Sequence, residues 1–161
     1  MNIAYLLTGS NQENPLSQLS EAKKRIESCC GHIIASSSIY ETAAWGFEDQ
    51  PSFLNQALEL ETPLSAEQLM QSLLQVEQDM GRVRIQKFGP RIIDIDILFF
   101  NHDVLKTRLL SVPHPHLQER KFALIPLTEL APNYFHPVLQ QTVEDLLEAC
   151  ADQLEVKKMD V

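Results

Sequence analysis

Cysteines and long apolar runs are both scarce in this sequence. The three cysteines include the adjacent pair Cys29 and Cys30, and no two stand in a C-x-x-C spacing. This count and spacing argue against a disulfide framework or a zinc site, so we expect reduced thiols in the cytoplasm. No segment approaches the roughly 20 apolar residues that span a bilayer, and the first residues show no signal-type pattern. We therefore expect no membrane association.

Glycine is scarce too, and the five glycines form none of the glycine-rich motifs that bind phosphate. There is no G-x-x-x-x-G-K-[ST] sequence and no G-x-G-x-x-G sequence after a predicted strand. The segment Gly9-Ser10-Asn11 is too short to be a phosphate loop. Any phosphate group bound by this protein must therefore be held by Arg or His side chains and a metal ion.

Basic residues are outnumbered by acidic ones. The chain has 13 Lys and Arg against 22 Asp and Glu, which gives a formal net charge of -9. The overall charge argues against a nucleic-acid or anionic-membrane partner. RNA binding is also disfavoured because no predicted sheet face combines aromatic with basic residues.

Hydrophobic residues make up 44% of the 161 residues, which is enough to build a core without a disulfide or structural metal. Strand and helix patterns alternate along the chain. We expect buried or alternating strands over residues 2–8, 33–40, 53–61 and 92–100. We expect helices after Asn14-Pro15, after the capping box of Ser65 and Gln68, and after Thr142 as far as Leu154.

The remaining segments are expected to be irregular. Residues 41–52 and 82–91 are predicted loops, residues 105–126 an irregular segment with a helical turn near 117–120, and residues 155–161 a frayed tail. The order of elements predicts an α+β fold of ferredoxin-like type, an antiparallel sheet with helices packed on it. We expect a single catalytic domain over residues 1–161.

The strongest local signal for chemistry is Asp94-Ile95-Asp96. A period of two puts both carboxylates on one face of the strand, with Ile93, Ile95, Ile97 and Phe99 on the other. Two carboxylates about 7 Å apart at Cα can hold hard cations such as Mg²⁺ together with substrate phosphates. The alternative is a solvated strand face, but like charges two residues apart on an apolar strand require something to neutralise them.

A basic segment leads directly into this strand. It contains Arg82, Arg84, Lys87 and Arg91, and Gly89-Pro90 sets a turn before the last of them. Guanidinium groups match phosphate oxygens, so the segment favours a metal and polyphosphate site over a merely solvated loop.

Two weaker signals lie elsewhere in the chain. His114 and His116, followed by Arg120-Lys121-Phe122, are better suited to phosphates than to zinc because no third ligand is nearby; a structural Pro-rich loop is the alternative. Phe53 and Asn55 share a strand face and can stack a planar heterocycle and pair with its amide-like edge, although a core Phe and an exposed Asn are the plainer interpretation.

Together these residues resemble the 6-hydroxymethyl-7,8-dihydropterin pyrophosphokinases. The resemblance rests chiefly on residues 87–98, KFGPRIIDIDIL. Other matching segments follow in the same order over about residues 1–135: Gly9-Ser10-Asn11, Tyr40-x-Thr42, Gly46, Gln50-Pro51-x-Phe53-Leu54-Asn55, Glu77-x-x-x-Gly81-Arg82-x-Arg84, Val112-Pro113-His114-Pro115, Arg120-x-Phe122, Pro126-Leu127 and Ala131-Pro132.

The resemblance implies a ferredoxin-like fold and a folate-pathway transferase. The enzyme would move pyrophosphate from its co-substrate ATP to the hydroxymethyl oxygen of 6-hydroxymethyl-7,8-dihydropterin and release AMP. Asp94 and Asp96 would bind two Mg²⁺ ions, and these two carboxylates with Arg82 and Arg91 would be the catalytic residues. The implied pterin-binding residues are Thr42, Ala43, Trp45, Phe53, Asn55 and Phe122. The implied ATP-binding residues are Glu77, Arg84, Lys87, Arg91, Ile97, Ser111, His114 and Arg120.

Some positions depart from the family pattern. Ala43-Ala44 stands where many relatives have two prolines, and Leu74 and Leu109 stand where some have Gln and Arg. The rival function is a non-catalytic small-molecule or metal sensor on the same fold. We expect a monomer whose loops 41–52 and 82–91 close over the bound substrates.

Overall fold

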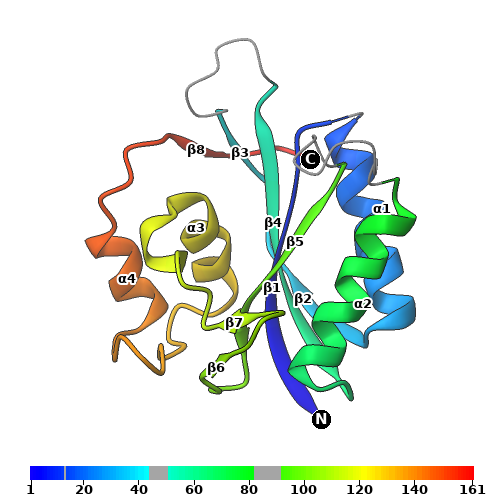
Figure 1. Cartoon of the computed structure of the whole chain (residues 1–161). Coiled ribbons are helices and arrows are strands. Elements are labelled where there is room, and N and C mark those ends of the chain that lie inside the picture. Colours follow the sequence, from blue (N-terminus) through cyan, green and yellow to red (C-terminus); the bar gives the residue numbers. More distant parts are fainter. Residues whose placement is uncertain (13, 44–50, 82–91) are drawn as a thin grey trace.

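The computed structural model describes residues 1–161 except 13, 44–50 and 82–91. An antiparallel sheet forms the middle layer, and helices pack on both of its faces (Figure 1). Helices α1 (Pro15–Cys29) and α2 (Ala66–Asp79) cover one face, and α3 (Lys121–Leu130) and α4 (Val143–Ala149) cover the other. This arrangement confirms the α+β class predicted from the sequence.

The sheet is built around strand β1 (Asn2–Ser10), which pairs with β4 (Phe53–Thr62) on one side and β5 (Asp94–Phe100) on the other. Strands β2 (His32–Ser36) and β3 (Tyr40–Thr42) both pair with β4, and β8 (Val156–Lys158) pairs with β3. Two short strands, β6 (Leu105–Lys106) and β7 (Ser111–Val112), form a separate hairpin, and a 3₁₀ turn, η1 (Leu117–Glu119), precedes α3.

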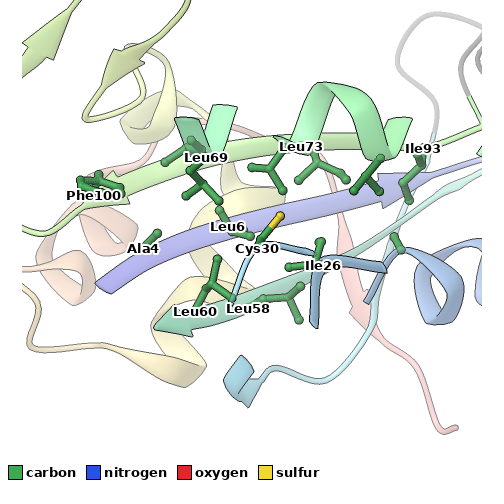
Figure 2. Packing of buried hydrophobic residues seen from close by; sticks show 14 of the residues in the cluster. Ala4, Leu6, Ile26, Cys30, Leu58, Leu60, Leu69, Leu73, Ile93 and Phe100 are labelled. Atoms are coloured by element: carbon green, nitrogen blue, oxygen red, sulfur yellow. The ribbon is translucent and has the colours of Figure 1, made fainter. Parts of the chain in front are cut away.

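Two apolar layers hold the helices to the sheet. Leu6 and Leu58 of the sheet pack with Ile26 of α1 and Leu69 of α2 in the first layer (Figure 2). Leu124 of α3 belongs to the second layer, together with Leu7, Leu98, Phe99, Val143 and Leu146. Burying each such large side chain stabilises the fold by roughly 1.5–3 kcal/mol. The helices are thus fixed on both faces, and the ends of the strands are left to form a site.

Helix boundaries follow the local sequence signals where these are strong. The Ser65 Oγ accepts a hydrogen bond from the Gln68 N–H, and the Gln68 side chain accepts one from the Ser65 N–H, so the predicted capping box is confirmed. Asn14 precedes Pro15 at the start of α1, but its side chain makes no capping hydrogen bond.

A bulge in β5 corrects the predicted face of one residue. The register pairs Ile97 with Leu6 but Phe99 with Tyr5, so Leu98 is an extra residue in β5. Bulges of this kind shift the side chains beyond them to the other face. Phe99 therefore packs with α3 and α4, not with Ile95 and Ile97 as the alternation predicted. The two aspartates precede the bulge and keep their predicted common face.

Three further differences concern the second half of the chain. Helix α3 lies in part of the segment predicted to be irregular, because Pro126 and an almost wholly apolar sequence hide its periodicity. Helix α4 ends at Ala149, and the residues expected to continue it are not helical. Residues 156–158 are strand β8 rather than a frayed tail, because their backbone groups pair with β3. Among the described residues, no helix combines the length and apolar character needed to cross a membrane.

Candidate active site

A cavity of about 660 Å³ lies where the end of β1 meets the beginnings of β4 and β5. The antiparallel register explains why these three ends come together, since Gly9 near the end of β1 is opposite both Asn55 and Asp94. The described residues that line the cavity are Leu7, Gly9, Thr42, Ala43, Phe53, Asn55, Asp94, Asp96, Glu119, Arg120, Phe122, Asp152 and Leu154.

The lining joins most of the predicted site residues that the structure describes. Seven elements or segments contribute to it, although the residues are up to 147 positions apart in the chain, from Leu7 to Leu154. The implied pterin residues Thr42, Ala43, Phe53, Asn55 and Phe122 are all in this lining, as are both aspartates and Arg120. Several predicted site residues lie outside the described residues: Trp45, Arg82, Arg84, Lys87 and Arg91. The predicted closure of loops 41–52 and 82–91 concerns segments that are also wholly or largely outside them.

Gly9 leaves the space that the Asn55 amide occupies. A Cβ atom at position 9 would stand 2.5 Å from the Asn55 Oδ1, a distance that no side chain tolerates without displacement. Asn55 is a buried polar residue on the neighbouring strand, directly across from this glycine. The short Gly9-Ser10-Asn11 segment therefore contributes by making room for the buried Asn55 amide at the cavity.

Asp94 and Asp96 lie half-buried on the sheet face that carries α3 and α4, and both line the cavity. Asp96 is paired with Leu7, whose side chain packs on that same face. Between them, the Ile95 N–H donates a 2.8 Å hydrogen bond to the Glu77 Oε2. Glu77 thus joins α2 to β5 at the aspartates.

Two aromatic rings and an arginine line the cavity near the start of α3. Phe53 begins β4, and Phe122 is in the first turn of α3, so the rings come from opposite sides of the helix–sheet boundary. The Arg120 guanidinium carbon is 5.8 Å from the centroid of the Phe122 ring, within the range of a cation–π contact. This contact holds a positive charge beside an aromatic surface at the cavity.

Thr42 carries a buried polar atom in the same lining. Its Oγ1 is buried and has no hydrogen-bond partner among the residues that the structure describes. Buried hydroxyl groups nearly always have a partner, so this atom is suited to receive one from a ligand.

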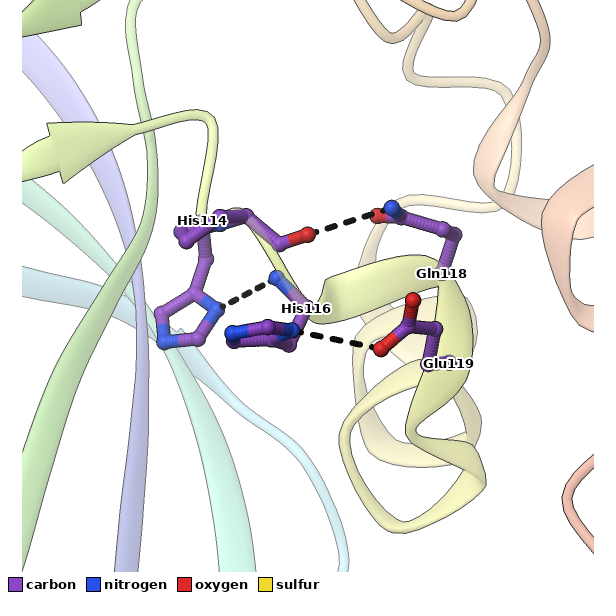
Figure 3. Close-up of polar contacts among 5 residues, drawn as sticks. His114, His116, Gln118 and Glu119 are labelled. Carbon is purple, nitrogen blue, oxygen red and sulfur yellow. Dashed lines mark hydrogen bonds and ion pairs between the residues drawn. The ribbon is translucent and has the colours of Figure 1, made fainter.

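His114 belongs to a turn of short-range hydrogen bonds before α3 (Figure 3). Its ring Nδ1 accepts a hydrogen bond of 3.2 Å from the backbone N–H of His116, and the backbone N–H of His114 donates to the Leu98 carbonyl. The His116 ring contacts the Glu119 carboxylate at 3.2 Å, and the Gln118 amide donates to the Pro115 carbonyl. The turn therefore fixes His114 between β5 and the cavity residue Arg120.

The pKa of His114 is lowered to about 4. Burial is the largest cause, and the positive charge of Arg120 and the neighbouring His116 add to it. The ring is therefore neutral at pH 7, and because Nδ1 accepts a hydrogen bond, its proton is on Nε2. His114 can offer a phosphate one N–H donor but no full positive charge.

Four implied ATP residues that the structure describes are not in the cavity lining: Glu77, Ile97, Ser111 and His114. Ile97 is buried in the layer under α1 and α2, on the face opposite the aspartates, and Ser111 begins β7. Conversely, sequence reasoning missed Leu7, Glu119, Asp152 and Leu154. These four belong to no motif, and only the fold brings them to the cavity. No group of three or more His, Cys, Asp or Glu side chains suited to a metal occurs within the described ranges.

Titration of His114 provides a test of its burial. We expect an NMR titration, assigned with His114→Gln, to find the His114 ring neutral down to about pH 4. Because its pKa is lower in the folded than in the unfolded chain, the free energy of unfolding should fall as the pH falls from 6.5 through about 4. The His114→Gln variant should show a smaller fall in this window. A His114 midpoint near 6.5 would contradict the described environment.

The sequence matches proteins of one enzyme family over most of its length. Residues 5–132 match the family model described as 7,8-dihydro-6-hydroxymethylpterin-pyrophosphokinase, HPPK. A protein of Aquifex aeolicus named 2-amino-4-hydroxy-6-hydroxymethyldihydropteridine pyrophosphokinase is 40% identical over 145 residues, 90% of each chain. The protein of that name from Haemophilus influenzae is 34% identical over 158 residues, 98% of each chain.

A solved structure of an HPPK-DHPS protein in complex with substrates has the same fold. Its TM-score is 0.74 at 18% sequence identity, and the alignment covers 92% of this chain but only 43% of that longer chain. The matched sequences, which extend over most of this chain, establish more than the fold. The chain belongs to the 7,8-dihydro-6-hydroxymethylpterin-pyrophosphokinase family.

Proposed function

We propose that the cavity at the strand ends is where this protein carries out its family's reaction. In that reaction a pyrophosphoryl group passes from ATP to the hydroxymethyl group of 6-hydroxymethyl-7,8-dihydropterin, in folate biosynthesis, and AMP is released. The supporting observation is that one cavity contains an aromatic pair, a buried amide, two carboxylates and an arginine. These are the groups needed to hold a planar heterocycle beside a polyphosphate.

The pterin occupies the part of the cavity between Phe53 and Phe122 in this proposal. The two rings stack on its faces, and the Asn55 amide pairs with its pyrimidine edge. Thr42 and Ala43 complete this end, where the buried Thr42 Oγ1 gains the hydrogen-bond partner that it lacks among the described residues. Trp45 is a further proposed pterin residue, outside the described ranges.

Asp94 and Asp96 form the metal end of the proposed site. Their two carboxylates face one cavity, and Mg²⁺ typically binds one or two carboxylates together with substrate phosphates and water. A site of this kind needs no cluster of three protein ligands, so the described residues fit it. Bound here, as two ions in our proposal, Mg²⁺ would supply charge neutralisation for the ATP phosphates.

Positioning is the main contribution of the protein to the reaction. The hydroxymethyl oxygen forms a bond to the β-phosphorus of ATP and loses its proton, and the bond from that phosphorus to the oxygen shared with the α-phosphate breaks. Stacking by Phe53 and Phe122 holds the attacking group in place, and Arg120 and neutral His114 bind phosphate oxygens. Arg82, Arg84, Lys87 and Arg91 are proposed to act on the same phosphates. Glu77, Ile97 and Ser111 support the nucleotide side from outside the cavity lining.

We also propose that the chain acts as a monomeric single domain in the cytoplasm. The cavity already combines, within one chain, the aromatic, amide and carboxylate groups that the proposed reaction uses. Cys29, Cys30 and Cys150 are free thiols, which fits a reducing compartment.

Product analysis tests the reaction itself. With ATP, Mg²⁺ and the hydroxymethyl dihydropterin, we expect chromatography to show AMP and a pterin diphosphate in equal amounts. ADP with a pterin monophosphate would refute pyrophosphoryl transfer, and no turnover with intact binding would favour the sensor function.

Asp96→Asn tests the metal end. The substitution keeps the shape of the side chain and removes its charge, so we expect AMP formation to fall by about 100-fold or more with little change in melting temperature. Asp103→Asn, an exposed aspartate beyond β5, is the matched control and should retain full activity. Activity of Asp96→Asn within about threefold of wild type in Mg²⁺ would exclude a role in metal binding.

Phe122→Ala tests the pterin end. Loss of one stacking ring should weaken pterin binding by roughly 1–3 kcal/mol, on the scale known for bases on aromatic side chains, with nucleotide affinity little changed. Calorimetry with each ligand measures both effects. Phe135→Ala, which removes an exposed phenylalanine outside the cavity lining, should leave both affinities unchanged. Equal losses for the two ligands would point to a structural role for Phe122.

A further inference from the structure

The segment after α4 reaches the cavity although it belongs to none of the motifs described above. After α4 ends, the chain turns back across the molecule to pair β8 with β3 (Figure 1). On the way, Asp152 and Leu154 join the lining that also contains Phe53 and Phe122. This segment follows residue 135, beyond the region on which the resemblance to pyrophosphokinases rests.

Burial in this segment alternates with a period of two. Asp152, Leu154 and Val156 are half-buried, whereas the intervening residues Gln153 and Glu155 are exposed. An extended chain points successive side chains to opposite sides, so one face of the segment is directed inward. The inward face contributes an apolar side chain, Leu154, between two anchoring positions.

Backbone and side-chain hydrogen bonds fix the segment at both ends. Near its start, the Asp152 Oδ2 accepts a 3.1 Å hydrogen bond from the Lys121 N–H, and its Oδ1 accepts one of 3.0 Å from the Leu154 N–H. At its far end Val156 pairs with Thr42, and beyond β8 the Met159 N–H donates to the Ile39 carbonyl at 2.8 Å. Leu154 is therefore held in place before any ligand binds.

Asp152 supplies the cap that α3 does not provide for itself. The residue before this helix, Arg120, makes no side-chain capping hydrogen bond, and no acidic residue stands in the first turn. The Asp152 carboxylate, 31 positions away, accepts the N–H of Lys121 at the start of α3. A carboxylate stabilises this end of a helix through its exposed N–H groups and their positive partial charge. Phe122 is the next residue, so the cap is one position from a ring that lines the cavity.

We propose that residues 152–156 are a fixed wall of the pterin site, in which Leu154 contacts the bound pterin and Asp152 positions Phe122. Leu154 adds an apolar surface beside the two aromatic rings. The flat face of a bound pterin would displace water from this surface, which favours binding. Asp152 acts through the Lys121 N–H and does not touch the substrate. This inference rests on the proposed placement of the pterin between Phe53 and Phe122.

Leu154→Ala tests the apolar contact. We expect the pterin Kd and KM to rise roughly tenfold, with kcat and the ATP affinity unchanged, because the wall contacts only the pterin. Glu155→Ala, the exposed neighbour on the opposite face, is the matched control and should bind pterin as wild type does. A pterin Kd for Leu154→Ala within twofold of wild type, or an equal loss for ATP, would overturn the contact.

A second measurement does not depend on the folding of a variant. In the wild-type protein with pterin, Mg²⁺ and a non-hydrolysable ATP analogue, intermolecular nuclear Overhauser effects should connect the pterin protons to the Leu154 methyl groups. Their absence, with such effects seen to Phe122, would overturn the wall while leaving the proposed pterin site intact.

Paired substitutions test the positioning role of Asp152. Asp152→Asn keeps an oxygen that can accept the Lys121 N–H, whereas Asp152→Ala removes it. We expect Asp152→Ala to raise the pterin KM several-fold and Asp152→Asn to restore most of the affinity. Equal losses in both variants would overturn positioning through this hydrogen bond.

Phe122→Ala, measured in parallel, separates the proposed wall from the proposed pterin site. If this variant keeps wild-type pterin affinity, the placement of the pterin fails, and not only the wall.

Discussion

The site depends on one register, in which Gly9 lies opposite Asn55 on one side and Asp94 on the other. Side chains alternate along a strand, so a shift of one residue in either pairing would turn the Asn55 amide or the Asp94 carboxylate to the opposite face. The small size of Gly9 is part of the same constraint, because its missing Cβ is what admits the Asn55 amide. The apolar layers on both faces of the sheet specify this register, since a shift would also expose Leu6 and Leu58.

The charges that line the cavity determine which ligands it attracts. Four carboxylates, Asp94, Asp96, Glu119 and Asp152, and one basic side chain, Arg120, line it among the described residues. Such a surface attracts cations and opposes a polyanion such as ATP, in a chain that already carries a net charge of -9. This charge distribution supports our proposal that the nucleotide is bound here as a complex with a divalent cation. The low pKa of His114 has a related effect, because a neutral ring adds a hydrogen-bond donor without drawing in free anions.

The sequence predicted what depends on local spacing and missed what depends on distant partners. Period two placed Asp94 and Asp96 on one face correctly, and the capping box of Ser65 located the start of α2. Phe99 was assigned to the wrong face because a bulge is a property of two strands and not of one. Helix α3 was hidden by its apolar sequence, and it receives its cap from Asp152 in a segment with no recognisable motif. Residues 156–158 form a strand only because β3 offers them an edge.

Strand β8 also covers the outer edge of β3. A sheet edge with unpaired backbone groups is a template on which another chain can add a strand, and short edges carrying lysine discourage this. At β3 that edge is covered by three residues, of which Lys157 and Lys158 are exposed. At the opposite edge, the Glu77 carboxylate accepts the outward N–H of Ile95. A three-residue edge strand with two exposed lysines, and a β5 edge whose Ile95 N–H is already paired, are both poor templates for an added strand, which disfavours edge-to-edge aggregation at these two places.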